Sequence, residues 1–268
     1  MAVVRKLKQW LKQNRRSSNR MIRWGIRVFD GFVSFVRTAK GILTEKNSRA
    51  IWYMRLFQPK RTHQTTADTC MNRYPGIFSA CRDYFGTDAQ IRILSYGCAT
   101  GEEVVTLRQY FPNAEIVGAE INKNSLRICR SRNVDGKIRF IDSTPEEIRK
   151  NGPYDAVFCM AVFQRTPGRI MERNITDLSR IYPFSRFENQ ILDLDGCLKE
   201  KGLLILHLSQ YDLCDTAVYH KYSPCGEWNQ NFYGPYVFGQ DSKIKKEIGH
   251  RNSIFIKNPA YTENKSTD

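Results

Sequence analysis

The chain has 268 residues, 41% hydrophobic and 26% charged, which suits one sizeable globular domain with an extension. Its eight cysteines include no Cys-x-x-Cys pair, and its four histidines form no ligand cluster with them. With no secretory signal pattern and no run of 18 apolar residues, we expect a cytoplasmic protein with reduced thiols, no metal site and no membrane-spanning helix.

Most of the net charge of +15 resides in residues 1–61, which hold 16 Lys or Arg against two acids. Spacings of three and four predict a helix over 21–43 with an apolar stripe, consisting of Ile22, Ile26, Phe29, Val33 and Val36. This basic segment has four interpretations: binding of residues 1–43 to an anionic membrane surface, contact with nucleic-acid phosphates, packing on its own domain, or organellar targeting. The rest of the chain is nearly neutral, which argues against nucleic acid as the substrate.

Residues 62–71 are polar and predict a linker. The chain then enters a predicted helix that starts near Asn72 and runs through Cys81 and Tyr84.

A strand, a glycine turn and a helix follow one another over residues 91–111. Ile91, Ile93 and Leu94 predict a buried strand, and Gly97 and Gly101 bracket a tight turn. From Glu102 the apolar spacing becomes helical. Such a corner is typical of nucleotide binding in an open α/β sheet, because the backbone can approach a ligand closely there.

The two acids after the turn indicate which nucleotide binds. A dinucleotide fingerprint requires Gly-x-Gly-x-x-Gly and leaves the helix N-terminus to a diphosphate, whereas this turn is Gly-x-x-x-Gly followed by Glu102 and Glu103. Carboxylates would repel a pyrophosphate but suit a ligand with an ammonium and a sulfonium. The pattern therefore favours S-adenosylmethionine over NAD, although a ligand-free helix start with dipole-complementing acids remains the alternative.

A second strand over 115–120 ends in Glu120, 19 residues after Gly101, where an acid can accept hydrogen bonds from both ribose hydroxyls. Together the two segments resemble the cofactor motifs of class I S-adenosylmethionine-dependent methyltransferases. The Gly-Cys-Ala-Thr-Gly-Glu-Glu turn is most similar to that of chemotaxis-receptor (CheR-like) glutamate methyltransferases. The resemblance covers roughly residues 72–258.

The resemblance implies an α/β, Rossmann-like seven-stranded sheet with helices on both faces, in a domain over 62–258. A basic helical extension would precede it over 1–61, and a flexible tail would follow over 259–268. It also implies a cofactor site made by Arg73, Ser95, Gly97, Cys98, Thr100, Gly101, Glu103, Glu120, Ile121, Asp142, Ser143, Met160 and Ala161. Within this set Arg73 would pair with the cofactor carboxylate and Asp142 would reach the adenine amino group. From the residues alone, Arg73 could equally be a surface side chain, and Asp142 or Ser143 could cap the helix predicted over 145–150.

The sequence signals for the methyl acceptor are less specific than those for the cofactor. A third strand is predicted over 137–141 and a fourth, the most continuous apolar run, over 154–162. Methyl transfer occurs beyond the fourth strand in this fold, so Gln164 and Arg165 are candidate substrate contacts. CheR-like relatives carry Asn-Val where this chain has Ala161 and Val162, which weakens any transfer of their acceptor chemistry.

A helix-rich stretch over 170–198, with a packing face of Phe187, Ile191, Leu192 and Leu194, leads into a fifth strand over 203–208. Residues 236–244 and 252–257 resemble the closing antiparallel pair of the sheet. The polar and aromatic residues over 209–236, Tyr219 among them, form either an acceptor pocket or an ordinary covering loop. A protonated acceptor would need a base, for which His220, His207 and Tyr211 are the candidates.

These patterns predict a methyltransferase that acts on an oxygen of a small molecule or glycan. The two alternatives are a CheR-like protein carboxyl methyltransferase and a non-catalytic cofactor-binding protein attached through its basic arm. Intact Gly97, Gly101 and Glu120 argue against the second alternative.

Overall fold

The computed structural model describes residues 6, 9–11, 13, 14, 17–227, 230 and 235–259. The chain divides into two compact units, Met1–Tyr53 and Met54–Asp268, and passes from one to the other within helix α3 (Lys46–Phe57). Within the described residues, no helix is both long and apolar enough to cross a membrane.

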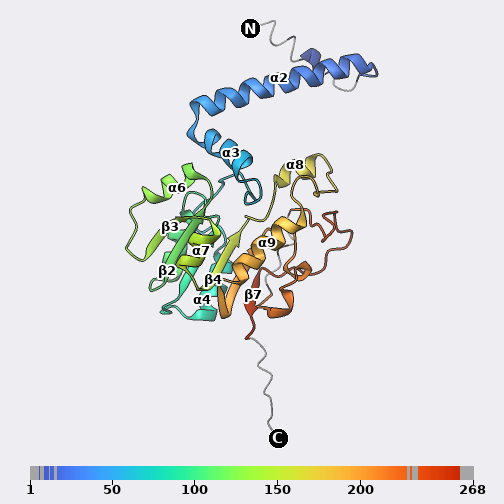
Figure 1. The fold of residues 1–268 in the computed structure, drawn as a ribbon. Helices are drawn as coiled ribbons and strands as arrows, with labels where there is room; N and C mark the ends of the chain where they lie inside the picture. Colours follow the sequence, from blue (N-terminus) through green and yellow to red (C-terminus); the bar gives the residue numbers. More distant parts are fainter. Residues whose placement is uncertain are drawn as a thin grey trace. The chain divides into compact units, whose positions relative to one another are not determined.

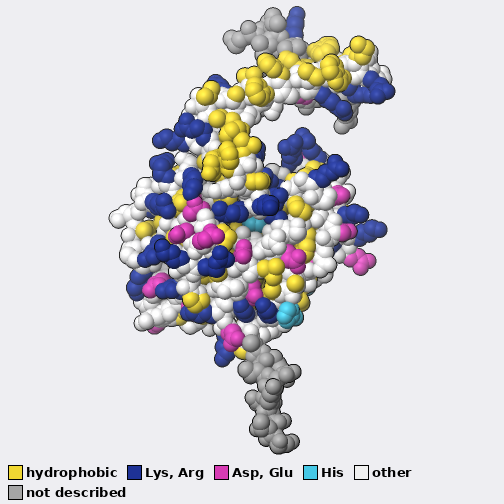
Figure 2. All heavy atoms as spheres, viewed as in Figure 1, with side chains coloured by type: hydrophobic (Ala, Val, Ile, Leu, Met, Phe, Trp, Pro, Cys, Tyr) yellow, Lys and Arg dark blue, Asp and Glu magenta, His cyan; other side chains and the backbone are white. Residues whose placement is uncertain are grey.

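The first unit contains α2 (Arg20–Thr44), which matches the helix predicted over 21–43. Asn19 caps it by accepting hydrogen bonds from the backbone N–H groups of Met21 and Ile22. The apolar face is wider than the predicted stripe, because Met21, Trp24, Phe32 and Phe35 are each 64% exposed or more. Figure 2 shows hydrophobic side chains along one side of the long helix of this unit and basic side chains elsewhere on it.

The second unit is a seven-stranded sheet in the order β3-β2-β1-β4-β5-β7-β6 (Figure 1). Its strands are β1 (Arg92–Tyr96), β2 (Glu115–Glu120), β3 (Ile138–Asp142), β4 (Tyr154–Met160), β5 (Leu198–His207), β6 (Tyr222–Pro224) and β7 (Ile254–Lys257). The first five are parallel, and β7 runs antiparallel to β5. The predicted seven-stranded, Rossmann-like fold is confirmed.

Helices cover both faces of this sheet, as predicted. On one face, apolar residues of α4 (Pro75–Phe85), α5 (Glu102–Tyr110) and α6 (Lys123–Arg130) form a core with Ile93, Ile116 and Ile205. On the other face, α7 (Pro145–Asn151), α8 (Pro167–Glu172) and α9 (Phe184–Asp195) pack on Leu94 and Val157. Neighbours Ile93 and Leu94 belong to opposite cores because successive side chains of a strand point to opposite faces.

Three local predictions were wrong. The strand that closes the sheet beside β7 is β6, whereas residues 236–244 fold back on themselves through a bridge between Phe238 and Ile244. Leu192 in α9 is 41% exposed and does not belong to the packing face. Thr144, rather than Asp142 or Ser143, caps α7 by accepting a hydrogen bond from the backbone N–H of Glu147.

Candidate cofactor and acceptor cavity

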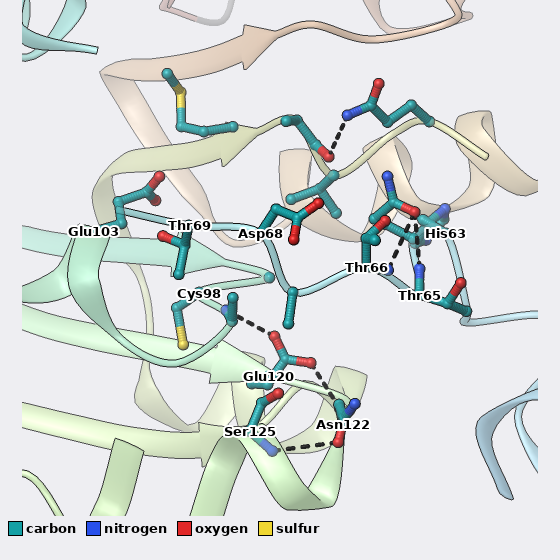
Figure 3. Close-up of a pocket in the computed structure, with 18 of the residues that line it drawn as sticks. His63, Thr65, Thr66, Asp68, Thr69, Cys98, Glu103, Glu120, Asn122 and Ser125 are labelled. Carbon is teal, nitrogen blue, oxygen red and sulfur yellow. Dashed lines mark hydrogen bonds between the residues drawn. The ribbon is translucent and has the colours of Figure 1, made fainter. Parts of the chain in front are cut away.

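A cavity of about 470 Å³ lies at the carboxyl ends of β1, β2 and β4, a volume within the range of about 300–1,000 Å³ typical of small-molecule sites. Its wall is formed by residues of the glycine turn, of the Glu120–Asn122 turn, of the segment after β4 and of residues 63–70 (Figure 3). Of the predicted cofactor residues, Arg73, Gly97, Cys98, Glu103, Glu120, Ile121, Ser143, Met160 and Ala161 line it. The carboxyl edge of a parallel sheet is where open α/β proteins bind ligands.

The glycine turn is fixed against β2 by its backbone. The N–H groups of Gly97 and Cys98 donate to the carbonyl oxygen of Ala119 at 2.8 and 3.2 Å. Gly97 has φ +75°, and a Cβ added there would lie 2.7 Å from Val162 Cγ2. The turn therefore requires glycine at position 97 for both backbone conformation and space.

Glu120 is 7% exposed, and its carboxylate is held by two backbone donors. The N–H of Asn122 donates to Oε1 at 2.7 Å, and the N–H of Ala99 donates to Oε2 at 2.9 Å (Figure 3). Burial raises the pKa of Glu120 to about 7, although these hydrogen bonds and one with Ile121 oppose the shift. The acid is thus oriented by the turn, and no Lys or Arg among the described residues forms an ion pair with it.

The two acids after the glycine turn have different environments. Glu103 lines the cavity and accepts a hydrogen bond from the Ser95 hydroxyl at 2.7 Å. Burial raises the pKa of Glu103 to about 7, opposed by that hydrogen bond and by the charge of Arg73. Glu102 forms an ion pair with Arg132 and accepts a hydrogen bond from Thr100. Of these two neighbouring acids, Glu103 is therefore the one available to a cation in the cavity.

Arg73 and Tyr74 precede α4 and line the cavity close to Glu103. The Arg73 guanidinium donates to the carbonyl oxygen of Asp68 at 2.8 Å and lies 5.3 Å from the centroid of the Tyr74 ring. The Tyr74 hydroxyl is buried, and it has no hydrogen-bond partner among the described residues. A buried hydroxyl without a partner on a cavity wall is suited to bind a polar ligand group.

Residues 62–71, predicted to be a linker, have no regular structure but form part of the site. Thr62 and His63 are 1% and 3% exposed, and every residue from 63 to 70 lines the cavity. In Figure 3 the labelled residues of this segment extend from Thr69 to His63 across the cavity. The only signal in the sequence was a run of small polar residues directly before α4, which predicts a solvent-exposed linker equally well.

Four of the predicted cofactor residues, Ser95, Thr100, Gly101 and Asp142, do not line the cavity. Ser95 orients Glu103. Asp142 is outside the lining because its carboxylate pairs with Arg61 and Lys123. Its neighbour Ser143 is 5% exposed and lines the wall.

The end of β4 leads from the cofactor side toward the acceptor side. Ala161 has φ +56°, a conformation unusual for a residue with a side chain, and its N–H donates to the His207 carbonyl oxygen at 2.8 Å. Gln164 lines the cavity and donates from Nε2 to the Ala161 carbonyl oxygen at 3.0 Å. Arg165 lies next to the wall, where its guanidinium donates to the carbonyl oxygen of His63 at 3.4 Å.

The three candidate bases lie outside the cavity lining. Tyr211 is fully buried in the core and donates its hydroxyl proton to the Tyr182 carbonyl oxygen at 2.5 Å. His220 is exposed, and His207 packs on Tyr74 with its Nδ1 3.0 Å from Ser253 Oγ. These positions argue against a direct role for any of them in proton transfer.

The loop after β5 is a covering segment in its described part. Residues 209–227, 230, 235 and 236 contribute nothing to the cavity lining, and Tyr219 packs partly buried on the core. Trp228, Asn231 and Tyr233, which belong to the same predicted pocket, lie outside the described residues. In the same region the side chains of Asp212, Cys214 and Asp215 approach one another within 4.8 Å, and Lys245 pairs with both acids.

Comparisons with known proteins show what this chain is similar to. The model of a family described as a methyltransferase domain matches residues 93–182. The malonyl-[acyl-carrier protein] O-methyltransferase of Bacillus cereus is 27% identical over 88 residues, which are 33% of this chain and 33% of that protein. The chain thus matches about a third of the length of this curated relative.

Two solved structures are similar to this one. One is a SAM-bound amino pentose methyltransferase from Micromonospora echinaspora, with 20% identity, a TM-score of 0.38, and coverage of 52% of this chain and 51% of that chain. The other is the bifunctional kinase-methyltransferase WbdD, with 16% identity, a TM-score of 0.42, and coverage of 74% of this chain and 44% of that chain.

The strand order and the cavity at the carboxyl ends of the strands define a nucleotide-binding α/β protein. The match over residues 93–182, which include β2, β3, β4 and most of β1, identifies a methyltransferase domain within this fold.

Proposed function

We propose that the protein transfers a methyl group from S-adenosylmethionine to an oxygen atom of a small molecule or glycan. The observation that carries this proposal is the single cavity wall that joins two oriented acids, Glu103 and Glu120, to the polar segment 63–70 and to Gln164. One part of the wall suits a cationic nucleoside, and the other offers polar groups for a second molecule.

The residues on the wall fit the cofactor. Glu120 would accept the ribose hydroxyls, Glu103 would meet the ammonium group, and Arg73 would pair with the carboxylate. Gly97 has no side chain, and a Cβ there would contact Val162. The cofactor can therefore approach the backbone of the glycine turn closely. Bound S-adenosylmethionine supplies a methyl group that is activated by its sulfonium, so the protein contributes mainly alignment and exclusion of water.

A hydroxyl acceptor also requires a proton acceptor, and His63 is the described histidine that lines the cavity. Burial lowers the pKa of His63 to about 3, a shift reinforced by Arg186, Arg165 and Arg61 and opposed by a hydrogen bond with Gln190. The imidazole is therefore uncharged at neutral pH, but so low a pKa makes it a weak base until a bound ligand raises that pKa. In this proposal His63 replaces the three bases suggested by the sequence.

The CheR-like alternative, a protein carboxyl methyltransferase, would need no base because a carboxylate acceptor is already deprotonated. Ala161 at the end of β4 distinguishes this chain from that group. Glu103 and Glu120, which form no ion pair among the described residues, support cofactor binding, and the non-catalytic alternative shares that property.

The stability of the product to mild base distinguishes these alternatives. We expect the full chain, incubated with methyl-labelled S-adenosylmethionine and an extract separated into small-molecule and protein fractions, to label the small molecules with base-stable methyl ethers. Label released as methanol from the protein fraction would instead support the carboxyl methyltransferase. Turnover should fall at least about tenfold in His63→Gln but not in His250→Gln, since general-base catalysis contributes about 10²–10⁴-fold. Labelling of neither fraction would favour the non-catalytic alternative.

For the first unit, we propose attachment to an anionic membrane surface, which would place the protein at the inner face of the cell membrane. The exposed aromatic side chains of α2, such as Trp24 and Phe32, suit the interface between headgroups and acyl chains. Arg20, Arg23 and Arg27 belong to the same helix, and Arg20 and Arg27 lie four and three residues from Trp24, so they border the aromatic face and can meet anionic lipid headgroups.

This attachment predicts that the full chain cosediments with phosphatidylglycerol vesicles at low salt but not with phosphatidylcholine vesicles. Trp24→Gln/Phe32→Gln should weaken binding about tenfold or more through lost apolar burial. Trp52→Gln, which removes an exposed tryptophan from α3 instead, serves as the control. Arg20→Gln/Arg27→Gln should cost roughly thirtyfold, at about 1 kcal/mol per charge. Equal binding to both vesicle types, or unchanged binding by the double variants, would contradict the proposal.

A further inference from the structure

His63 is held at the acceptor side of the cavity by aromatic neighbours. Its Nδ1 lies 2.8 Å from the Tyr182 hydroxyl, and its ring packs edge-on against Phe163 at 5.0 Å and Tyr182 at 5.7 Å between centroids. Figure 3 shows His63 and Glu103 on opposite sides of the cavity. The site is thus electrostatically asymmetric, with acids at the cofactor side and an uncharged imidazole at the other.

Several arginines converge around this imidazole from separate elements. Arg165, after β4, donates to the His63 carbonyl oxygen at 3.4 Å. Arg186, on α9, places its guanidinium carbon 5.8 Å from the centroid of the Tyr182 ring. Arg61 and Arg169 line the cavity itself, and Arg55 on α3 is close enough for its charge to act on Arg165.

Most of these positive charges have no counter-ion. Arg61 pairs with Asp142 at 3.4 Å, but across the described residues no carboxylate lies within ion-pair distance of Arg55, Arg165 or Arg186. Arg165 and Arg186 are partly buried, so water screens them less than it would on an open surface. Burial lowers the pKa of Arg165, and repulsion from Arg55 and Arg186 lowers it further.

Like charges held together in a partly buried position are unfavourable unless a ligand of opposite charge binds between them. Arginine is suited to that role because its planar guanidinium donates paired hydrogen bonds to phosphate and carboxylate groups. We propose that Arg165 and Arg186, which adjoin the cavity wall beside His63, form the anion-binding part of the acceptor site, so that the acceptor carries a phosphate or a carboxylate. This inference rests on the proposed function, because it assigns the chemical class of the molecule that enters beside the cofactor.

The bound anion also affects proton transfer. Arg165 and Arg186 disfavour a protonated His63, and an anion between them would neutralise that effect. The anionic group thus serves both to position the acceptor and to make His63 a better proton acceptor when the acceptor is present.

Calorimetric titration of the full chain, saturated with S-adenosylhomocysteine at fixed ionic strength, tests the site with inorganic phosphate and separately with succinate. We expect one of the two anions to bind, and the one that binds more tightly identifies phosphate or carboxylate as the group. Arg165→Gln and Arg186→Gln should each weaken that binding about tenfold or more, as expected for loss of a charged hydrogen bond. Arg139→Gln removes an exposed arginine of β3 and is the matched control. All variants contain the basic first unit. Any anion that binds to this unit therefore contributes equally to every titration and does not affect the comparison.

Equal anion affinity in the three variants, or no binding of either anion by the wild type, would overturn the inference. Affinity for S-adenosylhomocysteine, measured first in each variant, verifies folding and should be unchanged. If the wild type fails to bind S-adenosylhomocysteine at all, the proposed function itself fails, which is a separate result from loss of the anion site.

Discussion

Glu120→Ala is expected to weaken the binding of S-adenosylmethionine and S-adenosylhomocysteine about a hundredfold, measured by isothermal titration calorimetry. The carboxylate is buried and aimed by the N–H groups of Asn122 and Ala99, so the two ribose hydroxyls can donate to an acceptor that needs no reorganisation. Two hydrogen bonds to a charged group contribute about 1.5 kcal/mol or more each, and tenfold in affinity corresponds to about 1.4 kcal/mol. NAD should not bind the wild type.

Glu115→Ala is the matched control, because Glu115 starts the same strand, is exposed and pairs with Arg92. It should leave cofactor affinity within about twofold of the wild type. Similar affinities for Glu120→Ala and Glu115→Ala would remove the basis for placing the ribose at β2.

The same titrations should depend on pH. Burial raises the pKa of both Glu103 and Glu120 from an ordinary value of 4.5 to about 7, so the unliganded folded protein retains protons that the unfolded chain has already released. These carboxyls therefore stabilise the free fold at low pH, and that contribution is lost as pH rises from 4.5 to 7. A ligand that requires ionised carboxylates should bind about tenfold more weakly at pH 6 than at pH 8 for each group involved. Glu103→Gln should remove part of this dependence.

Gly97→Ala is expected to lower the free energy of unfolding by about 2–5 kcal/mol and to reduce cofactor binding. Alanine at φ +75° is strained by roughly 1–2 kcal/mol. The added Cβ would also lie 2.7 Å from Val162 Cγ2, and overpacking of this kind adds about 1–3 kcal/mol. Urea unfolding measures the total.

Gly86→Ala separates the two causes. Gly86 has φ +87° and ψ 150° at the end of α4, with nothing within 4 Å of an added Cβ, so only backbone strain should appear, of about 1–3 kcal/mol. Adding Val162→Ala to Gly97→Ala should recover part of the difference between the two single variants. If Gly97→Ala is no more destabilising than Gly86→Ala, the close contact with Val162 has no energetic weight.

The cofactor half of the site could be predicted because its determinants are local in the sequence. Gly97 and Gly101 fix a turn by their backbone freedom, and Glu120 ends a strand whose apolar pattern is clear. The fold follows for the same reason, since a strand or helix is specified by the spacing of its own residues. Local spacing could not show that Glu102 and Glu103 have different roles. Glu102 forms an ion pair with Arg132, which follows the next helix in the chain.

The acceptor half of the site depends on contacts between residues that are distant in the sequence. The candidate bases predicted from the sequence, His220, His207 and Tyr211, are therefore replaced by His63 in the proposed function. His63 meets Tyr182 across 119 positions in the chain, and Arg165 is 102 positions from the carbonyl oxygen that it binds. Conversely, Tyr211 looked available for catalysis until its ring was seen packed among Phe184, Phe187 and Phe238. A polar run such as 62–71 has the same composition whether it is a free linker or a cavity wall.

The sequence by itself therefore determined the class of fold, the cofactor turn and the basic character of the first unit, all of which depend on periodicity, glycine conformation and charge. Only the tertiary structure decided which polar groups face the cavity, because burial and side-chain orientation are set by elements that pack together from distant parts of the chain. The arginines around His63 are an example. Arg55, Arg165 and Arg186 are unremarkable in the sequence and become a charged group only when α3, the segment after β4 and α9 come together.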